Sequence, residues 1–417
     1  MAQMLCGDEV AAIVCDMGTS ICKFGSAGHD SPRHIFRSEI GTMNVNEENK
    51  LVAGDSSLRN PLLEMDISYP LGPDGINWDG IEALFKYGIE DSMRLESSEY
   101  PVMLVENYFN SSPEKQSKTL EMLFESFSCP AVFMGHHGML SAFSAGRSTA
   151  LVVDFGATET RVMPIVDGYV LRKAVISTSR AGNSFDKHIF KQIESSGLSL
   201  KPWYECPSVL RNSAPPVTTK SFRDMHMQDI IKDIKRWFCF VPLNHQDGCY
   251  KVPFIPPYVL PDGNSVLPME NVSLHPELLF EPSRAVSRSQ PAHTHSLPAH
   301  AQALDIDCET DSLQELVYAS LSKCDVDARK DLAMNIVLTG GGALIDGIPA
   351  RLTAELSTVL PTNMRVKILP ALPIERHHAA WIGGSILSIC GSFQQMWFSR
   401  SEYEEFGMSP VGRKFMR

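Results

Sequence analysis

The chain has 417 residues, of which 43% are hydrophobic and 21% charged, and its formal net charge is −12. That length is more than one hydrophobic core usually serves, so we expect two domains of ordinary globular composition. No stretch approaches the roughly 18 uninterrupted apolar residues of a membrane span, and the acidic start of the chain is unlike a signal peptide. The negative charge argues against direct binding to nucleic-acid phosphates. It would suit a basic partner such as a histone, although acidity also serves solubility alone.

Ten cysteines are spread singly along the chain, and none forms a Cys-x-x-Cys pair. This spacing indicates neither a structural zinc site nor the disulfide framework of a secreted protein. We therefore expect reduced thiols in a cytosolic or nuclear protein.

An internal repeat is the clearest organising feature. Ala11–Ser20 and Ala150–Thr158 are both short apolar runs that end in Asp-x-Gly followed by small or hydroxylated residues. Each continues through a second apolar stretch to a glycine, at Gly25 and Gly168, which is typical of a strand, a tight turn and a returning strand. Two such copies predict two similarly built halves that face each other. Two unrelated hairpins that share Asp-x-Gly are the alternative.

A third glycine element follows in the last quarter of the chain. Met334–Thr339 has the composition of a strand, three glycines come directly after it, and Ala343–Leu356 has apolar residues at nearly helical spacing. A strand, a glycine turn and a helix are a common way to bring backbone close to a ligand.

Other elements are predicted from periodicity and turn residues. Residues 261–264 predict a turn between two short strands, and the Ser-, Pro- and His-rich composition around residues 283–303 predicts a surface insertion. The histidines of this insertion have no evident fourth metal ligand, so a plain loop is favoured over a metal site. Further helices are expected at residues 78–93, 113–127, 184–195, 225–240 and 312–322.

The two hairpin tips have the chemistry that nucleotide phosphates need, namely backbone N–H donors, hydroxyls and a cation. Thr19 and Ser20 would face the terminal phosphates, and Lys23 would reach them as a point charge. Asp16 and Asp154, one from each half, would hold the waters of a bound Mg²⁺, while the glycine turn would lie against adenosine. The predicted nucleotide-binding residues are Asp16, Gly18, Thr19, Ser20, Lys23, Asp154, Gly156, Thr158, Gly340, Gly341 and Gly342.

The order of these three elements resembles that of the actin superfamily, and similar segments run over nearly the whole chain. The similar segments are Asp233–Lys235 with Cys239, Tyr258–Gly263, Pro276–Pro282, Lys323–Leu332, Trp381–Leu387, Phe393–Trp397 and Ser401–Tyr403. The resemblance implies the α/β actin-like ATPase-domain fold, with two duplicated halves around a nucleotide cleft and with ATP and Mg²⁺ as ligands. The first half would comprise residues 1–150 with 377–417, and the second residues 151–376.

Several positions depart from the pattern of actin. His137 stands where actin has a glutamine that helps to place the attacking water, and Ala157 stands where actin has a second aspartate. Arg161 and His377 replace a histidine and a lysine. Because alanine binds neither water nor a metal shell, and phosphoryl transfer depends on positioning the nucleophile, we expect ATP to be bound and hardly hydrolysed. No catalytic residue is predicted, although His137 leaves slow hydrolysis open.

The segment that corresponds to actin's filament-gripping loop, residues 40–69, is shorter here and different in composition. We therefore expect weak polymerisation or none. A different loop that serves the same purpose is the alternative.

Ser144–Thr149, Asp154–Thr158 and Asp167–Leu171 resemble the nuclear class-four actin-related proteins, called actin-like six in animals. This resemblance implies a non-filamentous subunit of chromatin remodelling and histone acetyltransferase complexes, found in the nucleus with a cytoplasmic pool besides. Its implied partners are nuclear actin, a helix of the large ATPase or scaffold subunit, and histones. Phe143, Ile386 and Leu387 are candidate linings of an apolar groove for that helix, or else ordinary core.

Two competing functions remain open at this point. One is a divergent cytoskeletal actin-like ATPase that hydrolyses ATP and assembles. The other is a sugar-kinase or chaperone relative with the same nucleotide core, which the actin-like segment from Trp381 to Tyr403 disfavours.

Overall fold

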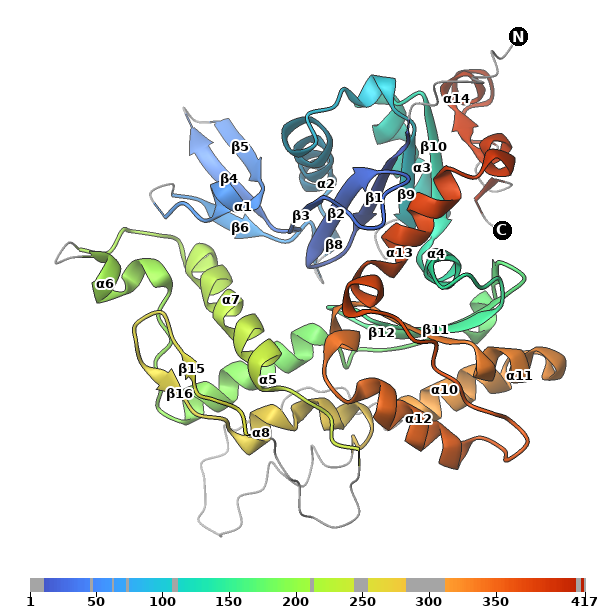
Figure 1. Cartoon of the computed structure of the whole chain (residues 1–417). Coiled ribbons are helices and arrows are strands. Elements are labelled where there is room, and N and C mark those ends of the chain that lie inside the picture. The colour runs from blue at the N-terminus through green and yellow to red at the C-terminus, as the bar shows by residue number, and fades with distance from the viewer. Residues whose placement is uncertain are drawn as a thin grey trace.

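The computed structural model describes residues 11–45, 48–61, 64–72, 75–106, 112–210, 214–243, 254–282, 312–409 and 414–415. Two α/β halves lie one above the other in Figure 1, each built on its own sheet. Among these residues, no helix combines the length and the apolar character that crossing a membrane requires.

The sheet of the upper half has the strand order β18-β10-β9-β1-β2-β3. Its strands are β1 (Ile13–Met17), β2 (Ile21–Ser26), β3 (His34–Arg37), β9 (Val102–Glu106), β10 (Ala131–His136) and β18 (Phe398–Ser399). β1 and β2 form an antiparallel hairpin, whereas β9 runs parallel to β1 and β10 to β9. Every residue of β1 is buried, as expected for a central strand that is covered on both faces.

The sheet of the lower half repeats this plan, with the order β13-β12-β11-β17 and β14 paired to β12. Its strands are β11 (Ala150–Phe155), β12 (Thr160–Val166), β13 (Tyr169–Val170), β14 (Ile176–Thr178) and β17 (Ile336–Thr339). β11 and β12 form the antiparallel hairpin, and β17 runs parallel to β11 as β9 does to β1. The repeat predicted from the sequence is therefore confirmed.

Helices pack around both sheets and bury the apolar faces that their sequence patterns present. Around the upper sheet lie α2 (Trp78–Lys86), a π-helical continuation (Tyr87–Ser92), α3 (Pro113–Glu125), α4 (His137–Ser144), α13 (Pro373–Ser388) and α14 (Arg400–Phe406). Around the lower sheet lie α10 (Leu313–Ser322), α11 (Val326–Met334) and α12 (Ile348–Val359), whereas α5 (Gly182–Ser195) and α7 (Lys220–Phe238) pack on each other beside it.

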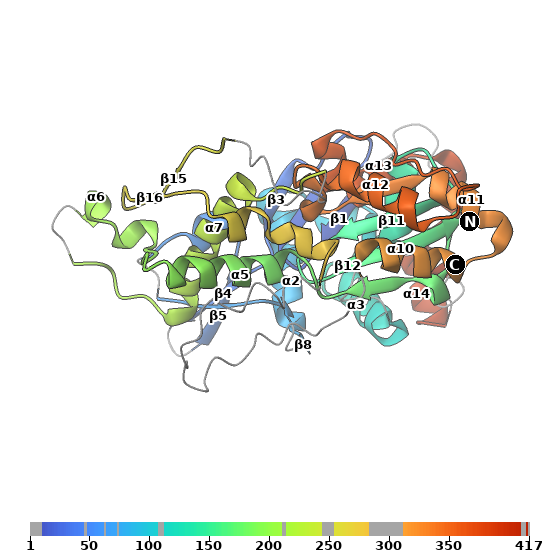
Figure 2. The same cartoon turned by 90° about the horizontal axis from the view of Figure 1, so that it is seen from below.

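Each half also carries a smaller lobe, on the left in Figure 1. The upper lobe holds β4 (Ile40–Val45), β5 (Glu48–Ala53), β6 (Asp66–Ser68) and α1 (Asp55–Leu58), with β7 (Leu71–Gly72) and β8 (Gly75–Ile76) nearby. The lower lobe holds α5 and α7 with α6 (Pro207–Leu210), α8 (Glu270–Ser273), β15 (Tyr258–Val259) and β16 (Ser265–Val266). Figure 2 shows this lower lobe beside the group formed by α10 to α12.

Two predicted helices begin several residues away from their expected starts. The helix expected at residues 225–240 starts at Lys220, because Thr219 caps it by accepting a bond from the N–H of Phe222. The helix expected from Ala343 is a short 3₁₀ turn (Gly341–Leu344), and α12 begins only at Ile348. Gly347 separates the two with a φ of 89°, a left-handed conformation that glycine adopts without strain. The expected turn at residues 261–264 is confirmed between β15 and β16.

The insertion predicted around residues 283–303 lies outside the described residues, but the chain on its two sides is tied together. Gln314 donates from its side-chain amide to the carbonyl of Phe280 at 3.1 Å. Ser312 begins α10 with a capping box, in which its N–H donates to the Glu315 carboxylate at 2.7 Å.

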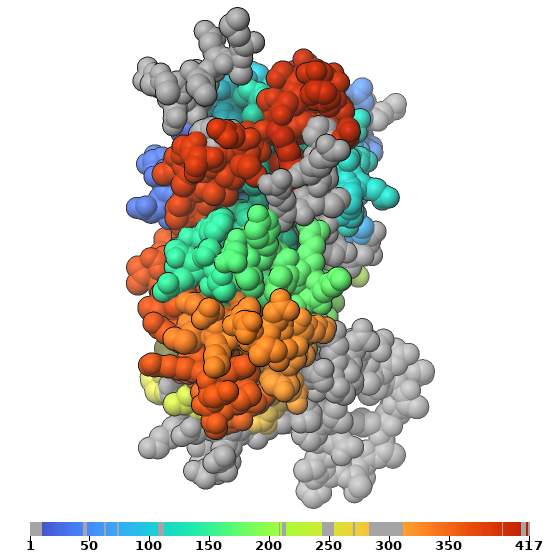
Figure 3. All heavy atoms as spheres, turned by 90° about the vertical axis from the view of Figure 1, so that its right-hand side faces the viewer, coloured from blue at the N-terminus to red at the C-terminus, as the bar shows by residue number. Residues whose placement is uncertain are grey.

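The two halves are joined where α13 crosses α4. α13 packs on β1 and β9 of the upper sheet and also on β17 of the lower one, and the predicted domain boundary at residue 377 falls inside it. Trp381 is fully buried and donates its indole N–H to the carbonyl of Val14 at 3.0 Å. On the side shown in Figure 3, the red C-terminal segments, the green segments and the orange helices form one continuous surface.

Gly383 permits this crossing, because a Cβ there would overlap the carbonyl oxygen of Leu140 on α4. We expect Gly383→Ala to lower the free energy of unfolding by about 3 kcal/mol or more, since an added methyl must push the two helices apart. Gly391→Ala is the matched control, because a Cβ at Gly391 meets no atom within 4 Å. Denaturant unfolding of both variants measures the difference, and equal stabilities would contradict the close-packed crossing.

Candidate functional site

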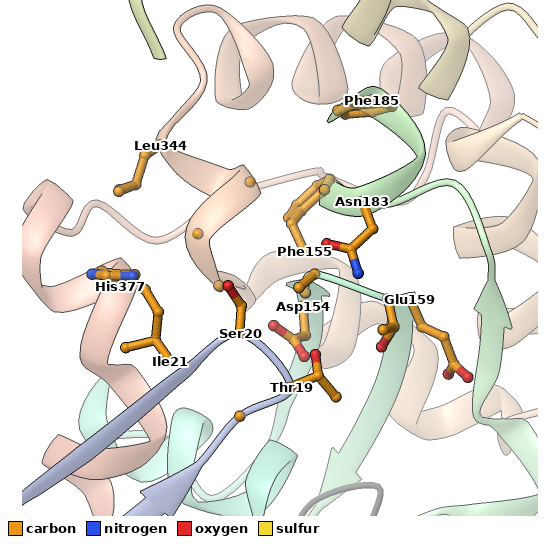
Figure 4. A pocket seen from close by; sticks show the side chains of 18 of the residues that line it. Thr19, Ser20, Ile21, Asp154, Phe155, Glu159, Asn183, Phe185, Leu344 and His377 are labelled. Atoms are coloured by element: carbon orange, nitrogen blue, oxygen red, sulfur yellow. The ribbon is translucent and has the colours of Figure 1, made fainter. Parts of the chain in front are cut away.

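A cavity of about 540 Å³ lies between the two halves. It is lined by the tips of both hairpins, the glycine turn after β17 and residues of α5 and α7. All eleven residues that the sequence predicted to bind nucleotide line this one cavity, and so do His137 and Ala157. Figure 4 shows Thr19 and Ser20 of the first hairpin facing Asp154 of the second.

The two hairpin tips have the same backbone geometry. The N–H of Gly18 donates to the carbonyl of Ile21 at 3.0 Å, and the N–H of Gly156 donates to that of Glu159 at 3.0 Å. A Cβ on Gly18 would lie 2.9 Å from the Ile21 oxygen, and one on Gly156 would lie 2.8 Å from the Glu159 oxygen, so both turns depend on glycine. The residues between these bonds are thereby presented to the cavity.

The glycine turn is pressed against the second hairpin. Gly340 has a φ of +90°, and a Cβ there would lie 2.6 Å from the Asp154 carboxylate. Its N–H donates to the carbonyl of Arg376 at 3.1 Å, which ties the turn to the start of α13. A Cβ on Gly342 would lie 2.9 Å from the Cβ of Phe155. Backbone, rather than side chains, therefore forms this wall of the cavity.

Each hairpin places a carboxylate opposite a cation. Asp16 lies opposite Lys23 in the ladder of β1 and β2, and Lys23 donates to its carboxylate at 2.9 Å. Asp154 lies opposite Arg161 in the ladder of β11 and β12, but Arg161 donates instead to Glu159, at 2.8 Å. The cavity thus receives the same pattern of charge from both sides.

These residues fit a bound Mg²⁺. The described residues contain no group of three or more His, Cys, Asp or Glu side chains arranged to hold a metal. Mg²⁺ bound with a nucleotide needs only one or two carboxylates, because phosphate oxygens and waters complete its shell. Asp16 and Asp154 supply one carboxylate from each half of the cavity wall.

His137 begins α4 and lines the cavity, with its Nδ1 atom 3.9 Å from the Asp154 carboxylate. The neighbouring His136 caps the helix by accepting a bond from the N–H of Gly138 at 3.1 Å. Burial lowers the pKa of His136 to about 3, with smaller effects from nearby positive charges, so His136 is neutral and can accept this bond.

Ala157 brings no polar side-chain atom to the cavity. Its carbonyl accepts a bond from the N–H of Asn183 at 2.7 Å, and this bond holds the start of α5 against the hairpin tip. The tip therefore offers backbone groups and the Thr158 hydroxyl, while its one nearby carboxylate, that of Glu159, is paired with Arg161 at 2.8 Å.

The opposite end of the cavity is less polar. Figure 4 shows His377, Ile21 and Leu344 together on one side, away from Glu159 and Asn183. Burial, assisted by the charge of Lys23, lowers the pKa of His377 to about 4. This ring is therefore neutral at pH 7, and it can pack against a flat apolar group such as a base.

Sequence reasoning missed the contribution of α7. Lys232, Lys235 and Arg236 all line the cavity. Lys235 bonds to Asp186 at 2.8 Å and donates to the carbonyl of Gly182 at 3.2 Å, which fixes α7 to the start of α5. The segment was noted only as a similar stretch, because nothing in it marks a ligand until its fold brings it to the cavity.

A second contact joins the halves on the lobe side of the cavity, and we call it the seam. Its apolar part is a buried cluster of six side chains from both lobes. These side chains are Leu58, Met65 and Ile67 of the upper lobe and Tyr204, Phe222 and Met225 of the lower lobe. Thr219 donates to the carbonyl of Met65 at 2.6 Å, and the N–H of Ile67 donates to the Ser221 hydroxyl at 3.0 Å.

Charged residues continue the seam toward the cavity. Arg37 of β3 bonds to Asp229 of α7 at 3.0 Å and also to Asp55 at 3.0 Å. Lys232, which lines the cavity, lies 3.6 Å from the buried carboxylate of Glu39. The halves are therefore connected on both sides of the cavity, by α13 with α4 and by the seam.

The three residues predicted for a partner groove lie outside the cavity. Ile386, on α13, is 43% exposed. Its neighbour Leu387 is partly buried and packs against two core clusters, and Phe143 of α4 is also partly buried. Ile389, just beyond α13, is 55% exposed, so an apolar surface here is centred on two isoleucines rather than on Leu387.

Comparison with known proteins matches the actin family over residues 7–416. Actin-related protein 4 of Arabidopsis thaliana is 33% identical, with 98% of this chain and 99% of that protein aligned. Actin-related protein 4 of Oryza sativa subsp. japonica is 32% identical over 98% of this chain and 99% of its own. The protein of the same name from Yarrowia lipolytica is 32% identical over 97% of this chain and 96% of its own. This chain belongs to the actin family.

Proposed function

We propose that this protein is a non-filamentous actin-related subunit of nuclear chromatin remodelling and histone acetyltransferase complexes, and that it holds ATP with Mg²⁺ as a structural ligand. It pairs with nuclear actin on a helix of the large subunit. The proposal that ATP binds rests on the cavity between the two duplicated hairpins. The two halves are joined on one side of this cavity by the crossing of α13 over α4, and on the other side by the seam.

The residues of the cavity support ATP as the ligand. Backbone N–H groups at two glycine tips, the hydroxyls of Thr19, Ser20 and Thr158, and the cation of Lys23 suit a chain of phosphates. The glycine turn and the neutral ring of His377 suit adenosine at the less polar end. Asp16 and Asp154 would hold Mg²⁺ through its waters, and the ion would neutralise phosphate charge.

Two features support a structural rather than a consumed nucleotide. Ala157 has no polar side-chain atom that could order an attacking water at its position in the second hairpin tip. The seam buries apolar side chains from both lobes, and these would have to be exposed to water before the cavity opened. A nucleotide held in this way stabilises the fold by mass action without turnover.

The nuclear part of the proposal rests on the resemblance to class-four proteins and on relatives named actin-related protein 4. The net charge of −12 suits a basic partner such as a histone. The exposed Ile386 and Ile389 suit the apolar face of a helix from a large subunit.

One observation favours the alternative, an actin-like ATPase that hydrolyses and assembles. His137 lines the cavity and lies 3.9 Å from Asp154, where an imidazole can orient a water. Turnover with filament formation is the behaviour that this alternative requires.

Mg-ATP is expected to stabilise the purified protein against heat. At a hundredfold excess over Kd the gain is about 2.7 kcal/mol, which a thermal melt resolves. Asp16→Ala should remove most of this gain by weakening Mg²⁺ binding, whereas Asp331→Ala, which changes an exposed aspartate of α11, should keep it.

Phosphate release and sedimentation are then measured on the same ATP-loaded sample. Negligible release and no pelleted polymer are expected. Steady release together with polymer would contradict the structural role and favour the ATPase alternative.

Loosening the seam should speed the release of nucleotide. Tyr69 donates its hydroxyl to Gln228 at 3.0 Å, and Ser221 accepts from the N–H of Ile67. The double variant Tyr69→Phe with Ser221→Ala removes both bonds, each worth about 1 kcal/mol, so release should be about tenfold faster or more. Chasing a fluorescent ATP analogue with unlabelled ATP measures the rate.

Ser195→Ala is the control for the seam variant, because among the described residues the hydroxyl of Ser195 bonds only within its own helix, to the carbonyl of Gln192. Its release rate should equal that of the unsubstituted protein. If the double variant also releases nucleotide at the unsubstituted rate, the seam does not limit exchange.

Ile386→Asp should abolish binding to the helical partner while leaving the melting temperature nearly unchanged, since this side chain is 43% exposed. Ile374→Asp places the same change in the first turn of the same helix, at a residue that is 53% exposed, and should leave binding intact. Co-purification with nuclear actin from nuclear extract, followed by immunoblotting, compares the two. Equal recovery would argue against this surface as the docking site.

A further inference from the structure

Glu159 and Arg161 lie together at the phosphate end of the cavity, and the proposed function gives neither a role. They flank Thr160, whose hydroxyl points the other way and donates to the carbonyl of Arg180 at 2.7 Å. Because side chains alternate along a strand, Glu159 and Arg161 share the face toward the cavity, and both line it. Their side chains are 32% and 28% exposed, so both are accessible to a ligand in the cavity.

The internal repeat assigns Arg161 a counterpart. Arg161 lies opposite Asp154 in the second hairpin as Lys23 lies opposite Asp16 in the first. Lys23 bonds to its opposite aspartate, whereas Arg161 is turned toward Glu159 at the hairpin tip. Each hairpin therefore brings one cation to the cavity, and Glu159 determines where the second cation points.

The guanidinium of Arg161 retains donors for a further acceptor. Its Nε atom donates to Glu159 at 2.8 Å, and Glu159 is its only hydrogen-bond partner among the described residues. An arginine has five N–H donors in a planar fork, so the two terminal nitrogens remain able to bind phosphate with two parallel bonds. The positive charge of Arg161 also makes a small contribution to the lowered pKa of His136.

We propose that Arg161 recognises the terminal phosphate of a nucleoside triphosphate, that this makes the cavity selective for triphosphate over diphosphate, and that Glu159 limits the selectivity by holding Arg161 back. The proposal rests on the proposed function, because it requires nucleotide phosphates at the hairpin tips. A diphosphate lacks the group that Arg161 would meet, so the cation would stabilise only the triphosphate. Glu159 opposes that stabilisation in two ways, since it competes for the guanidinium and repels the phosphate.

The competing interpretation is that the pair of Glu159 and Arg161 only stabilises the hairpin, as a structural ion pair. Exposed ion pairs of this kind contribute little stability. The two interpretations differ in their predictions. If the ion pair is only structural, removing either partner changes the thermal stability equally and leaves the preference for ATP over ADP unchanged. If Arg161 instead binds the terminal phosphate, removing Arg161 lowers the affinity for ATP and removing the charge of Glu159 raises it.

The test measures Kd for Mg-ATP and Mg-ADP by calorimetry on the full chain, freed of nucleotide. Arg161→Met is expected to weaken ATP binding about tenfold to a hundredfold and to leave ADP binding within about threefold. Glu159→Gln is expected to tighten ATP binding about threefold, with a smaller effect on ADP. Arg161→Lys should restore part of the ATP affinity, because it keeps the charge and loses the fork.

Arg400→Met is the matched control, since Arg400 pairs with Glu404 at 3.0 Å on α14 and is not among the residues that line the cavity. Its ratio of ATP to ADP affinity should equal that of the unsubstituted chain. If Arg161→Met loses affinity equally for ATP and ADP, or loses none, this inference is wrong but the proposed function still holds. If the unsubstituted chain binds neither nucleotide, the proposed function fails and the inference fails with it.

Discussion

The close crossing of α13 over α4 is the constraint on which the rest of the structure depends. α13 packs on strands of both sheets, so the separation of the two helices sets how far apart the two hairpin tips lie. Gly383 makes the approach possible by leaving the Leu140 carbonyl uncovered by a side chain, and the buried Trp381 fixes the helix to β1 through its indole N–H. The shape of a cavity between two sheets depends on the contact that holds the sheets together. Here that contact is the close backbone packing of α13 on α4.

The seam restricts how far the two halves can move about the contact between α13 and α4. A single hinge leaves two domains free to open, because relative motion is the default when the interface between domains is small. Here the lobes also share a buried apolar cluster, a cross-cleft ion pair between Arg37 and Asp229, and bonds from the start of α7 to β6. Opening the cavity would expose that cluster and break those bonds together. The seam therefore couples access to the cavity with the packing of both lobes.

Much of the site was predictable because glycine turns and strand patterns are local signals. The hairpin tips at Gly18 and Gly156 and the turn at Gly340 could be predicted from short segments, and the cavity lining includes every residue predicted from them. The seam could not be predicted, since Leu58 and Phe222 have the composition of ordinary core and their contact joins distant parts of the chain. Arg161 was noted only as a departure from actin. Its equivalence to Lys23 becomes evident once the register of both hairpins is known.

The tie between Phe280 and Gln314 has a consequence for how this chain tolerates change. It holds the two borders of residues 283–311 beside each other through a hydrogen bond between described residues. The entropy of closing a loop grows only with the logarithm of its length, by about 0.6 kcal/mol for each doubling. Segments of very different length can therefore join these borders at nearly constant stability, which makes this position an attachment point where new sequence can be acquired while the cavity stays intact.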